Sequence, residues 1–130
     1  MKFENLNIKS TNGICEDSIN FIKSHGSIKK MEVTNSFSDA IDMDFSKIQI
    51  DSVKVNKSGN DCMDMSFGEY VVNNLDLINC KDNGISVGEK SKFESIDLLV
   101  KNSENALAVK DSGTANIENF KSINNNFCFR

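Results

Sequence analysis

The residues best suited to chemistry are aspartates that recur at a constant spacing. Asp17, Asp39 and Asp61 lie 22 residues apart, and Asn83 and Asn105 continue the series. Paired carboxylates can position and activate a water molecule, so the series is a candidate for catalytic residues. Short polar side chains also bond to nearby backbone groups in turns, so a purely structural role for the series is the alternative.

A second polar set follows the members of this series by a few residues. It comprises Asp42, Asp44, Asp64, Ser66, Ser86, Glu89 and Lys110. These groups can bond to the hydroxyl groups of a saccharide, so we take them as the candidate ligand-binding residues. Asp42, Asp44 and Asp64 alternatively offer the oxygen ligands that Ca²⁺ prefers, and no other cofactor is indicated.

The remaining reactive side chains give little support to other chemistry. His25 is the only histidine and lies in the turn 24–26, so we expect a surface position rather than a Cys/His nucleophile. The segment 84–88 matches G-x-S-x-G, but Ser86 falls inside an expected strand and not at a strand-to-helix turn. The cysteines are too few for a disulfide scaffold, lack zinc-ligand spacing and are expected to be reduced: Cys15, Cys62, Cys80 and Cys128.

The elements that must position these residues follow from an internal repeat of 22 residues. Apolar and polar residues alternate in segments that begin at 17, 39, 61, 83 and 105, as in residues 41–44. Residues 126–129 form a degenerate sixth copy. A second apolar segment precedes each copy and slips by one residue in the later copies. Alternation with a period of two predicts strands with one buried face. The 18 Asn residues and the absence of Pro favour corners with left-handed backbone conformations and side-chain ladders.

A unit of this length cannot bury its own apolar face, so successive units must stack. We therefore predict an all-β fold, a right-handed parallel β-helix solenoid of about six 22-residue coils, in one domain over residues 1–130. A leucine-rich repeat is the alternative, because the segment 72–80 fits its pattern. The second half of each unit alternates as a strand does and lacks a helical period, which favours the β-helix.

The predicted stack places particular side chains beside one another. Asp42 and Asp64 should be lateral neighbours on the outward face of one sheet, and Asp44 should lie beside Ser66. Phe45 and Phe67 have inward parity and are expected in the core. The alternative is that these rings, with Tyr70, form a platform on which a sugar stacks.

Four stretches within residues 35–111 resemble the active-site motifs of polygalacturonase-type glycoside hydrolases, which have a pectin-lyase-like β-helix fold. The motifs N-T-D, G-D-D, G-H-G and R-I-K are matched by residues 37–40, 59–62, 82–88 and 108–110. The resemblance implies that Asp39 and Asp61 position the attacking water. It also implies that Lys110 binds a sugar carboxylate.

The chain departs from this pattern at three positions. Asn60 stands in place of the general acid, Asn83 in place of the histidine, and Ala108 in place of the arginine. Because an amide has no titratable proton to give to the leaving oxygen, we expect the hydrolytic reaction to be lost.

A saccharide-binding β-helix module, with a polysaccharide or oligosaccharide as its ligand, is therefore the first functional hypothesis. The second is a structural protein that assembles through its ends, and the third is an altered polysaccharide hydrolase or lyase. Both terminal segments carry the coil pattern without an amphipathic cap, which predicts an end-to-end homo-oligomer, a capping partner or a longer parent chain.

Composition argues against several other partners. The net charge is −4 and the 15 basic residues are scattered, which disfavours nucleic acid. No apolar run approaches the roughly 18 residues of a membrane span, and the first residues open no signal peptide. Reduced cysteines fit the cytoplasm, whereas a longer parent protein could sit at the cell surface, so the sequence assigns no location.

Overall fold

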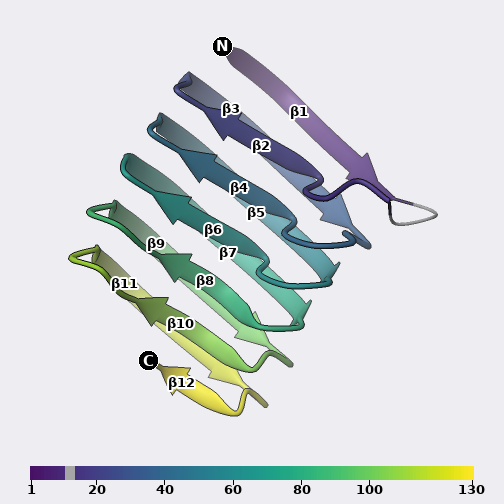
Figure 1. Ribbon diagram of the computed structural model, residues 1–130, viewed down its shortest axis with the longest axis vertical. Helices are drawn as coiled ribbons and strands as arrows, with labels where there is room; N and C mark the ends of the chain where they lie inside the picture. The colour runs from purple at the N-terminus through teal and green to yellow at the C-terminus, as the bar shows by residue number, and fades with distance from the viewer. Residues whose placement is uncertain (11–13) are drawn as a thin grey trace.

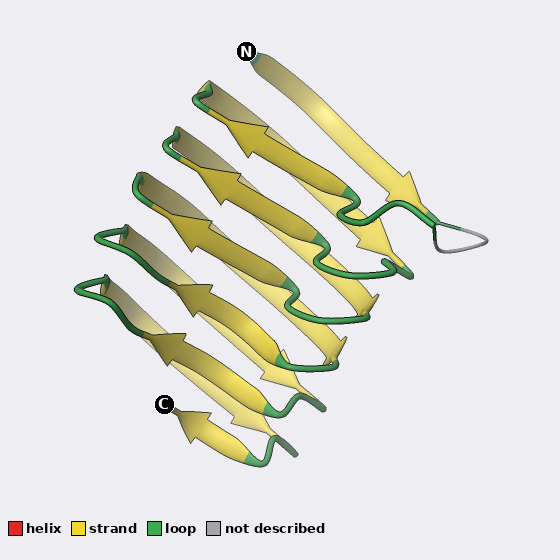
Figure 2. Cartoon of the chain, in the orientation of Figure 1, coloured by secondary structure: helices red, strands yellow, loops and turns green. Residues whose placement is uncertain are grey.

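The computed structural model describes residues 1–10 and 14–130, and its regular elements are twelve β-strands. In chain order they are β1 (Lys2–Lys9), β2 (Ile19–Ile22), β3 (His25–Thr34), β4 (Ile41–Asp44), β5 (Lys47–Ser58), β6 (Met63–Ser66), β7 (Glu69–Cys80), β8 (Asn83–Val87), β9 (Lys92–Lys101), β10 (Asn105–Val109), β11 (Thr114–Ile123) and β12 (Phe127–Phe129). No helix occurs in the described ranges (Figure 2), so the β-helix prediction is confirmed and the leucine-rich repeat is wrong.

The strands form two parallel six-stranded sheets that face each other. The long-strand sheet has the order β1-β3-β5-β7-β9-β11, and the short-strand sheet has the order β12-β10-β8-β6-β4-β2. The chain alternates between them and advances one strand per coil in each (Figure 1). The coils wind in a right-handed sense, the usual hand for a crossover between parallel strands.

The register confirms the 22-residue repeat and the slip in the later copies. Met63 pairs with Ile85 and Asn83 with Asn105, so the short-strand sheet keeps the spacing of 22. In the long-strand sheet Glu69 pairs with Lys92, a spacing of 23. The turn from β8 to β9 is longer than the turn from β6 to β7 and accommodates the extra residue.

The core lies between the sheets and consists of stacked apolar columns. Ile41, Met63 and Ile85 form one fully buried column, because residues in register on parallel strands face the same way. In the long strands two successive residues point outward at mid-strand, as Asp51 and Ser52 do in β5. Inward parity resumes at Val53, so a single long strand contributes two buried segments to the core.

The corners use left-handed backbone and asparagine ladders, as the composition predicts. Asn79, Asn102 and Asn124 each have a positive φ near 60°, a conformation that asparagine tolerates well. The Nδ2 of Asn102 donates to Oδ1 of Asn79 at 3.2 Å, and the Nδ2 of Asn124 donates to Oδ1 of Asn102 at 2.8 Å. The ladder ties each coil to the next at this corner.

Two cysteines correct the sequence prediction, because Cys62 and Cys80 form a disulfide. Cys80 ends β7, and the short turn that follows leads to Gly84, which stacks one coil beyond Cys62. Both cysteines face the interior and are buried. The separation of 18 residues is less than one coil, so the 22-residue spacing gives no sign of this contact. Cys15 and Cys128 are free and exposed.

Two further residues differ from expectation. Phe45 and Phe67 are exposed and do not lie in the core. Each has a φ of 48°, so the chain turns left-handed at the end of the short strand and the inward parity stops there. His25 is exposed as predicted, but it begins β3 and does not lie within the preceding turn.

Candidate functional site

The outward side chains of the short-strand sheet form the surface that the repeat predicts. Asp42 pairs with Asp64 and Asp44 with Ser66, so both predicted lateral contacts are confirmed. Ser86 continues the first row, in register with Asp64. We call this surface the polar face and define it by Asp42, Asp44, Asp64, Ser66, Ser86, Glu89 and Lys110.

Hydrogen bonds link neighbouring coils across the polar face. The Nδ2 of Asn20 donates to Oδ2 of Asp42 at 2.9 Å. The hydroxyl of Ser66 donates to Oε2 of Glu89 at 2.7 Å, which brings Glu89 from the β8–β9 turn to the edge of the sheet. The first bond joins the first short strand, β2, to the second, β4, and the other joins the third, β6, to the turn that follows the fourth, β8.

The aspartate column that precedes the short strands forms a ladder. Oδ1 of Asp39 accepts hydrogen bonds from the backbone N–H of Asp61 and from Nδ2 of Asn60, both at 2.8 Å. Oδ1 of Asp61 accepts from the backbone N–H of Asn83 at 2.9 Å and from its Nδ2 at 2.8 Å. The ladder continues from Asn83 to Asn105 at 3.0 Å. These bonds give the column the structural role proposed from sequence, whereas the water-positioning role of Asp39 and Asp61 stays a prediction.

The structure joins the two aspartate sets that sequence analysis treats separately. Burial, followed by repulsion from Asp44, Asp64, Asp17 and Asp39, raises the pKa of Asp42 to about 7. The carboxyls of both sets therefore lie close enough to repel one another.

The pKa of Asp61 is raised in the same way. Burial is the main cause of the rise to about 7, and the carboxylates of Asp39 and Asp64 add to it. Burial also raises the pKa of Asp64, while the nearby Ser86 hydroxyl and, less strongly, the charge of Lys110 oppose this rise. Asp61 is 5% exposed, so neighbouring residues cover its carboxyl group.

Lys110 is the cation of the polar face and reaches back over an earlier coil. A Cβ placed on Gly88 would lie 3.8 Å from Cε of Lys110 and 4.0 Å from Oγ of Ser66. Such a Cβ would be in ordinary van der Waals contact with the lysine, and its tightest contact would be the carbonyl oxygen of Met65 at 3.3 Å. The charge of the lysine lowers the pKa of Asp64, which places the ammonium group within electrostatic reach of that carboxylate.

An aromatic pair borders the same face. The rings of Phe45 and Phe67 are stacked in parallel with their centroids 4.7 Å apart, and they are 52% and 43% exposed. Each follows a residue of the polar face directly, Asp44 and Ser66 respectively. The third candidate ring, Tyr70, is buried, and its hydroxyl lies 2.9 Å from the carbonyl oxygens of Met43 and Ser66. Sequence reasoning favoured the core for Phe45 and Phe67 and kept the platform as the alternative, because strand alternation does not reveal where a corner begins.

Calcium binding by Asp42, Asp44 and Asp64 remains an untested hypothesis. Within residues 1–10 and 14–130, no group of three or more His, Cys, Asp or Glu side chains is arranged to hold a metal ion.

In the same ranges, no helix has the length and apolarity needed to cross a bilayer.

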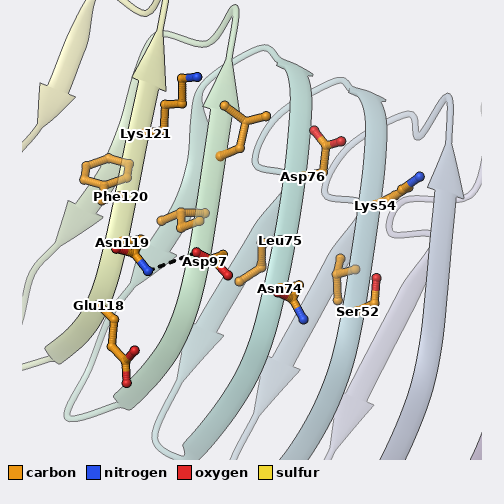
Figure 3. Close-up of a pocket in the computed structure, with 13 residues that line it drawn as sticks. Ser52, Lys54, Asn74, Leu75, Asp76, Asp97, Glu118, Asn119, Phe120 and Lys121 are labelled. Carbon is orange, nitrogen blue, oxygen red and sulfur yellow. Dashed lines mark hydrogen bonds between the residues drawn. The ribbon is translucent and has the colours of Figure 1, made fainter.

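Two hollows lie away from the polar face. One, of about 580 Å³, crosses β5, β7, β9 and β11 on the long-strand sheet (Figure 3). Its lining mixes Lys54, Asp76 and Lys121 with a hydrogen-bonded pair, Asn119 Nδ2 to Asp97 Oδ1 at 3.1 Å. The other, of about 900 Å³, follows the asparagine ladder at the corner. Neither is lined by residues of the predicted site, so both hollows serve as controls for the polar face.

Comparison with protein-family models, with curated proteins and with solved structures finds no match for this chain, so the fold and the site are argued from its own residues.

Proposed function

We propose that the chain is a saccharide-binding module whose ligand lies along the polar face of the short-strand sheet. The observation that carries the proposal is the exposed, stacked Phe45–Phe67 pair beside a row of hydrogen-bonding side chains. Saccharides present hydroxyl groups at their edges and apolar C–H groups on their ring faces. A surface that combines aromatic rings with a few placed polar groups matches both features.

The repeat of the fold supports an extended ligand. Equivalent side chains recur on neighbouring strands about 4.8 Å apart, a distance comparable to one sugar unit in a stretched glycan. Asp42 and Asp64, which are partly exposed, form such a pair on successive coils, and Asp44 and Ser66 form a second pair beside it. A linear oligosaccharide that runs along the solenoid axis would meet a polar group at each unit.

The test is a glycan array followed by affinity measurement on the strongest ligand. Phe45→Ala and Phe67→Ala should each weaken binding roughly tenfold, the loss expected when about 1.4 kcal/mol of ring contact is removed. Phe37→Ala is the matched control, because Phe37 is 63% exposed and lies at the opposite corner. The proposal fails if no glycan binds, or if the Phe37 variant loses as much affinity as the other two.

A second candidate function is assembly with another copy of the chain, and one observation favours it. Core-facing side chains of the last coils are accessible, and they line a largely apolar hollow of about 480 Å³ that includes Ala115, Ile117 and Phe120. A second copy could continue both sheets by adding β1 to β11 in the same strand direction. Light scattering over a concentration range should then show association. Ile117→Lys should abolish it and outward-facing Asn119→Lys should not; a monomer at all concentrations would exclude this function.

A further inference from the structure

The hollow on the long-strand sheet, which the proposed function leaves unused, lies between two rows of side chains. It has a volume of about 580 Å³ and crosses β5, β7, β9 and β11 (Figure 3). Residues in register on these strands form each row, so the rows run across the strands. The first row is Lys54, Asp76, Leu99 and Lys121. The second row is Ser52, Asn74, Asp97 and Asn119.

The first row carries two lysines without an ion-pair partner. Lys54 and Lys121 are exposed and stand at its two ends, on β5 and β11. The ion pairs among the described residues involve other lysines, on β3 and at the start of β5. Asp76 is next to Lys54 in register, but the two form no ion pair in the described part of the chain. Both ends of this row can therefore accept an anionic group.

The opposite side of the hollow carries negative charge. Asp97 is exposed on β9, and Glu118, also exposed, lines the hollow from β11. The Nδ2 of Asn119 donates to Oδ1 of Asp97 at 3.1 Å, which orients this carboxylate. Neither carboxylate forms an ion pair within residues 1–10 and 14–130. The hollow is therefore cationic at both ends of one side and anionic on the other side.

The spacing of these charges matches an extended peptide. Neighbouring strands lie about 4.8 Å apart, so Lys54 and Lys121 are separated by about 14 Å along the hollow, and Asp97 lies about 10 Å from the Lys54 end. An extended chain advances about 3.4 Å per residue and points its side chains to alternate sides. Residues i and i+4 of such a chain therefore reach the two lysines, and residue i+3 reaches Asp97 on the other side.

We propose that this hollow docks an extended peptide segment of a partner protein, with acidic residues at positions i and i+4 and a basic residue at i+3. Such a segment places each charge beside its opposite, whereas a polymer of one charge meets repulsion on one side of the hollow. The partner is a different protein, because no two acidic residues of this chain lie four positions apart. The inference is independent of the proposed function, which uses the other sheet.

The test uses two end-blocked synthetic peptides of equal composition, Glu-Thr-Val-Arg-Glu and the reordered Glu-Glu-Val-Arg-Thr. Their β-branched residues favour the extended conformation. Amide NMR during titration of the isotope-labelled chain should show the first peptide binding roughly three- to tenfold more tightly, because exposed charge pairs each contribute modestly. The shift changes should centre on Asn74, Asp97 and Asn119. Added salt should weaken binding, because exposed charges are screened.

A charge exchange locates the contacts. Lys54→Glu with Lys121→Glu should lose the first peptide and should bind Lys-Thr-Val-Arg-Lys more tightly than wild type does. Lys57→Glu with Lys90→Glu is the matched control, because both lysines are exposed at corners and the change in net charge is the same. The control should keep the first peptide and gain no affinity for the basic one. Thermal melting confirms that each variant is folded.

The outcomes separate this inference from the proposed function. Equal binding of the two peptides, or no binding of either, overturns the inference and leaves the saccharide proposal standing. An equal gain for the basic peptide in both double variants also overturns it, because net charge would then explain binding. If the strongest glycan found on the array displaces the first peptide, the hollow is the saccharide site and both proposals fail. Loss of the peptide with unchanged glycan binding in the Lys54→Glu/Lys121→Glu variant is the result expected for two separate surfaces.

Discussion

At the scale of single residues, the Asp61 carboxylate forms hydrogen bonds that stabilise the fold, but its negative charge is destabilised by burial and by neighbouring carboxylates. Its Oδ1 accepts two hydrogen bonds from Asn83, yet burial and neighbouring carboxylates raise its pKa to about 7. In the unfolded chain the same group titrates near 3.8. The folded state therefore holds the proton more tightly, and the unfolding free energy should fall as the pH rises from about 4 to about 7.

Asp61→Asn tests this balance. An amide keeps the Oδ1 acceptor, as Asn83 does toward Asn105 in the same column, and it removes the charge. We expect the variant to be more stable than wild type by about 1–3 kcal/mol above pH 7, with little difference below pH 4. Urea denaturation at both pH values measures it. Equal stability of variant and wild type above pH 7 would mean that Asp61 carries no electrostatic cost.

Residue positions along the strands could be predicted from sequence, because alternation and the 22-residue repeat fix which side chains face outward. Asp42 beside Asp64 follows from those two periods alone. Phe45 did not follow, because its φ of 48° ends the alternation at a corner that no glycine or proline marks. The proximity of Asp39 to Asp42 could not be predicted either. It depends on how the backbone bends between the two residues, and the repeat spacing carries no information about that bend.

At the scale of elements, stability depends on stacked columns more than on any single strand. A five-residue strand such as β8 is too short to be stable alone, so its core residue Ile85 depends on contacts with Met63 and Leu107 on the two neighbouring strands.

Ile85→Ala should lower the unfolding free energy by about 2–5 kcal/mol through loss of buried contacts and the cavity left behind. Ile96→Ala is the matched control, because Ile96 lies in β9 but is 42% exposed, and it should cost much less. Chemical denaturation followed by circular dichroism measures both. Similar losses for the two variants would contradict the assignment of the inner column.

The disulfide between Cys62 and Cys80 joins the end of β7 to the residue just before β6, the preceding short strand. It closes a loop of 18 residues, and constraint of the unfolded chain by such a loop contributes about 3 kcal/mol. The double variant Cys62→Ala/Cys80→Ala should therefore melt at a lower temperature, and reductant should lower the melting temperature of wild type but not of the variant. Mass spectrometry after thiol alkylation under non-reducing conditions should label Cys15 and Cys128 alone. Labelling of all four cysteines would disprove the bridge.

At the scale of the whole molecule, the solenoid divides into two surfaces of different character. The short-strand sheet presents clustered carboxylates with exposed rings, while the long-strand sheet presents mixed charges around a shallow hollow (Figure 3). The fold as a whole follows from sequence because one period governs every coil. The ligand could not be predicted from sequence in the same way, because its identity depends on which of the two outward surfaces binds it.

The central claim, that the ligand lies on the polar face, is tested most directly by amide NMR during titration with the strongest saccharide ligand found on the glycan array. We expect the largest shift changes at Asp42, Asp64 and Phe67, on neighbouring coils of one surface. Changes centred instead on Asn74, Asp97 and Asn119 would place the ligand in the hollow of the long-strand sheet and would contradict the account.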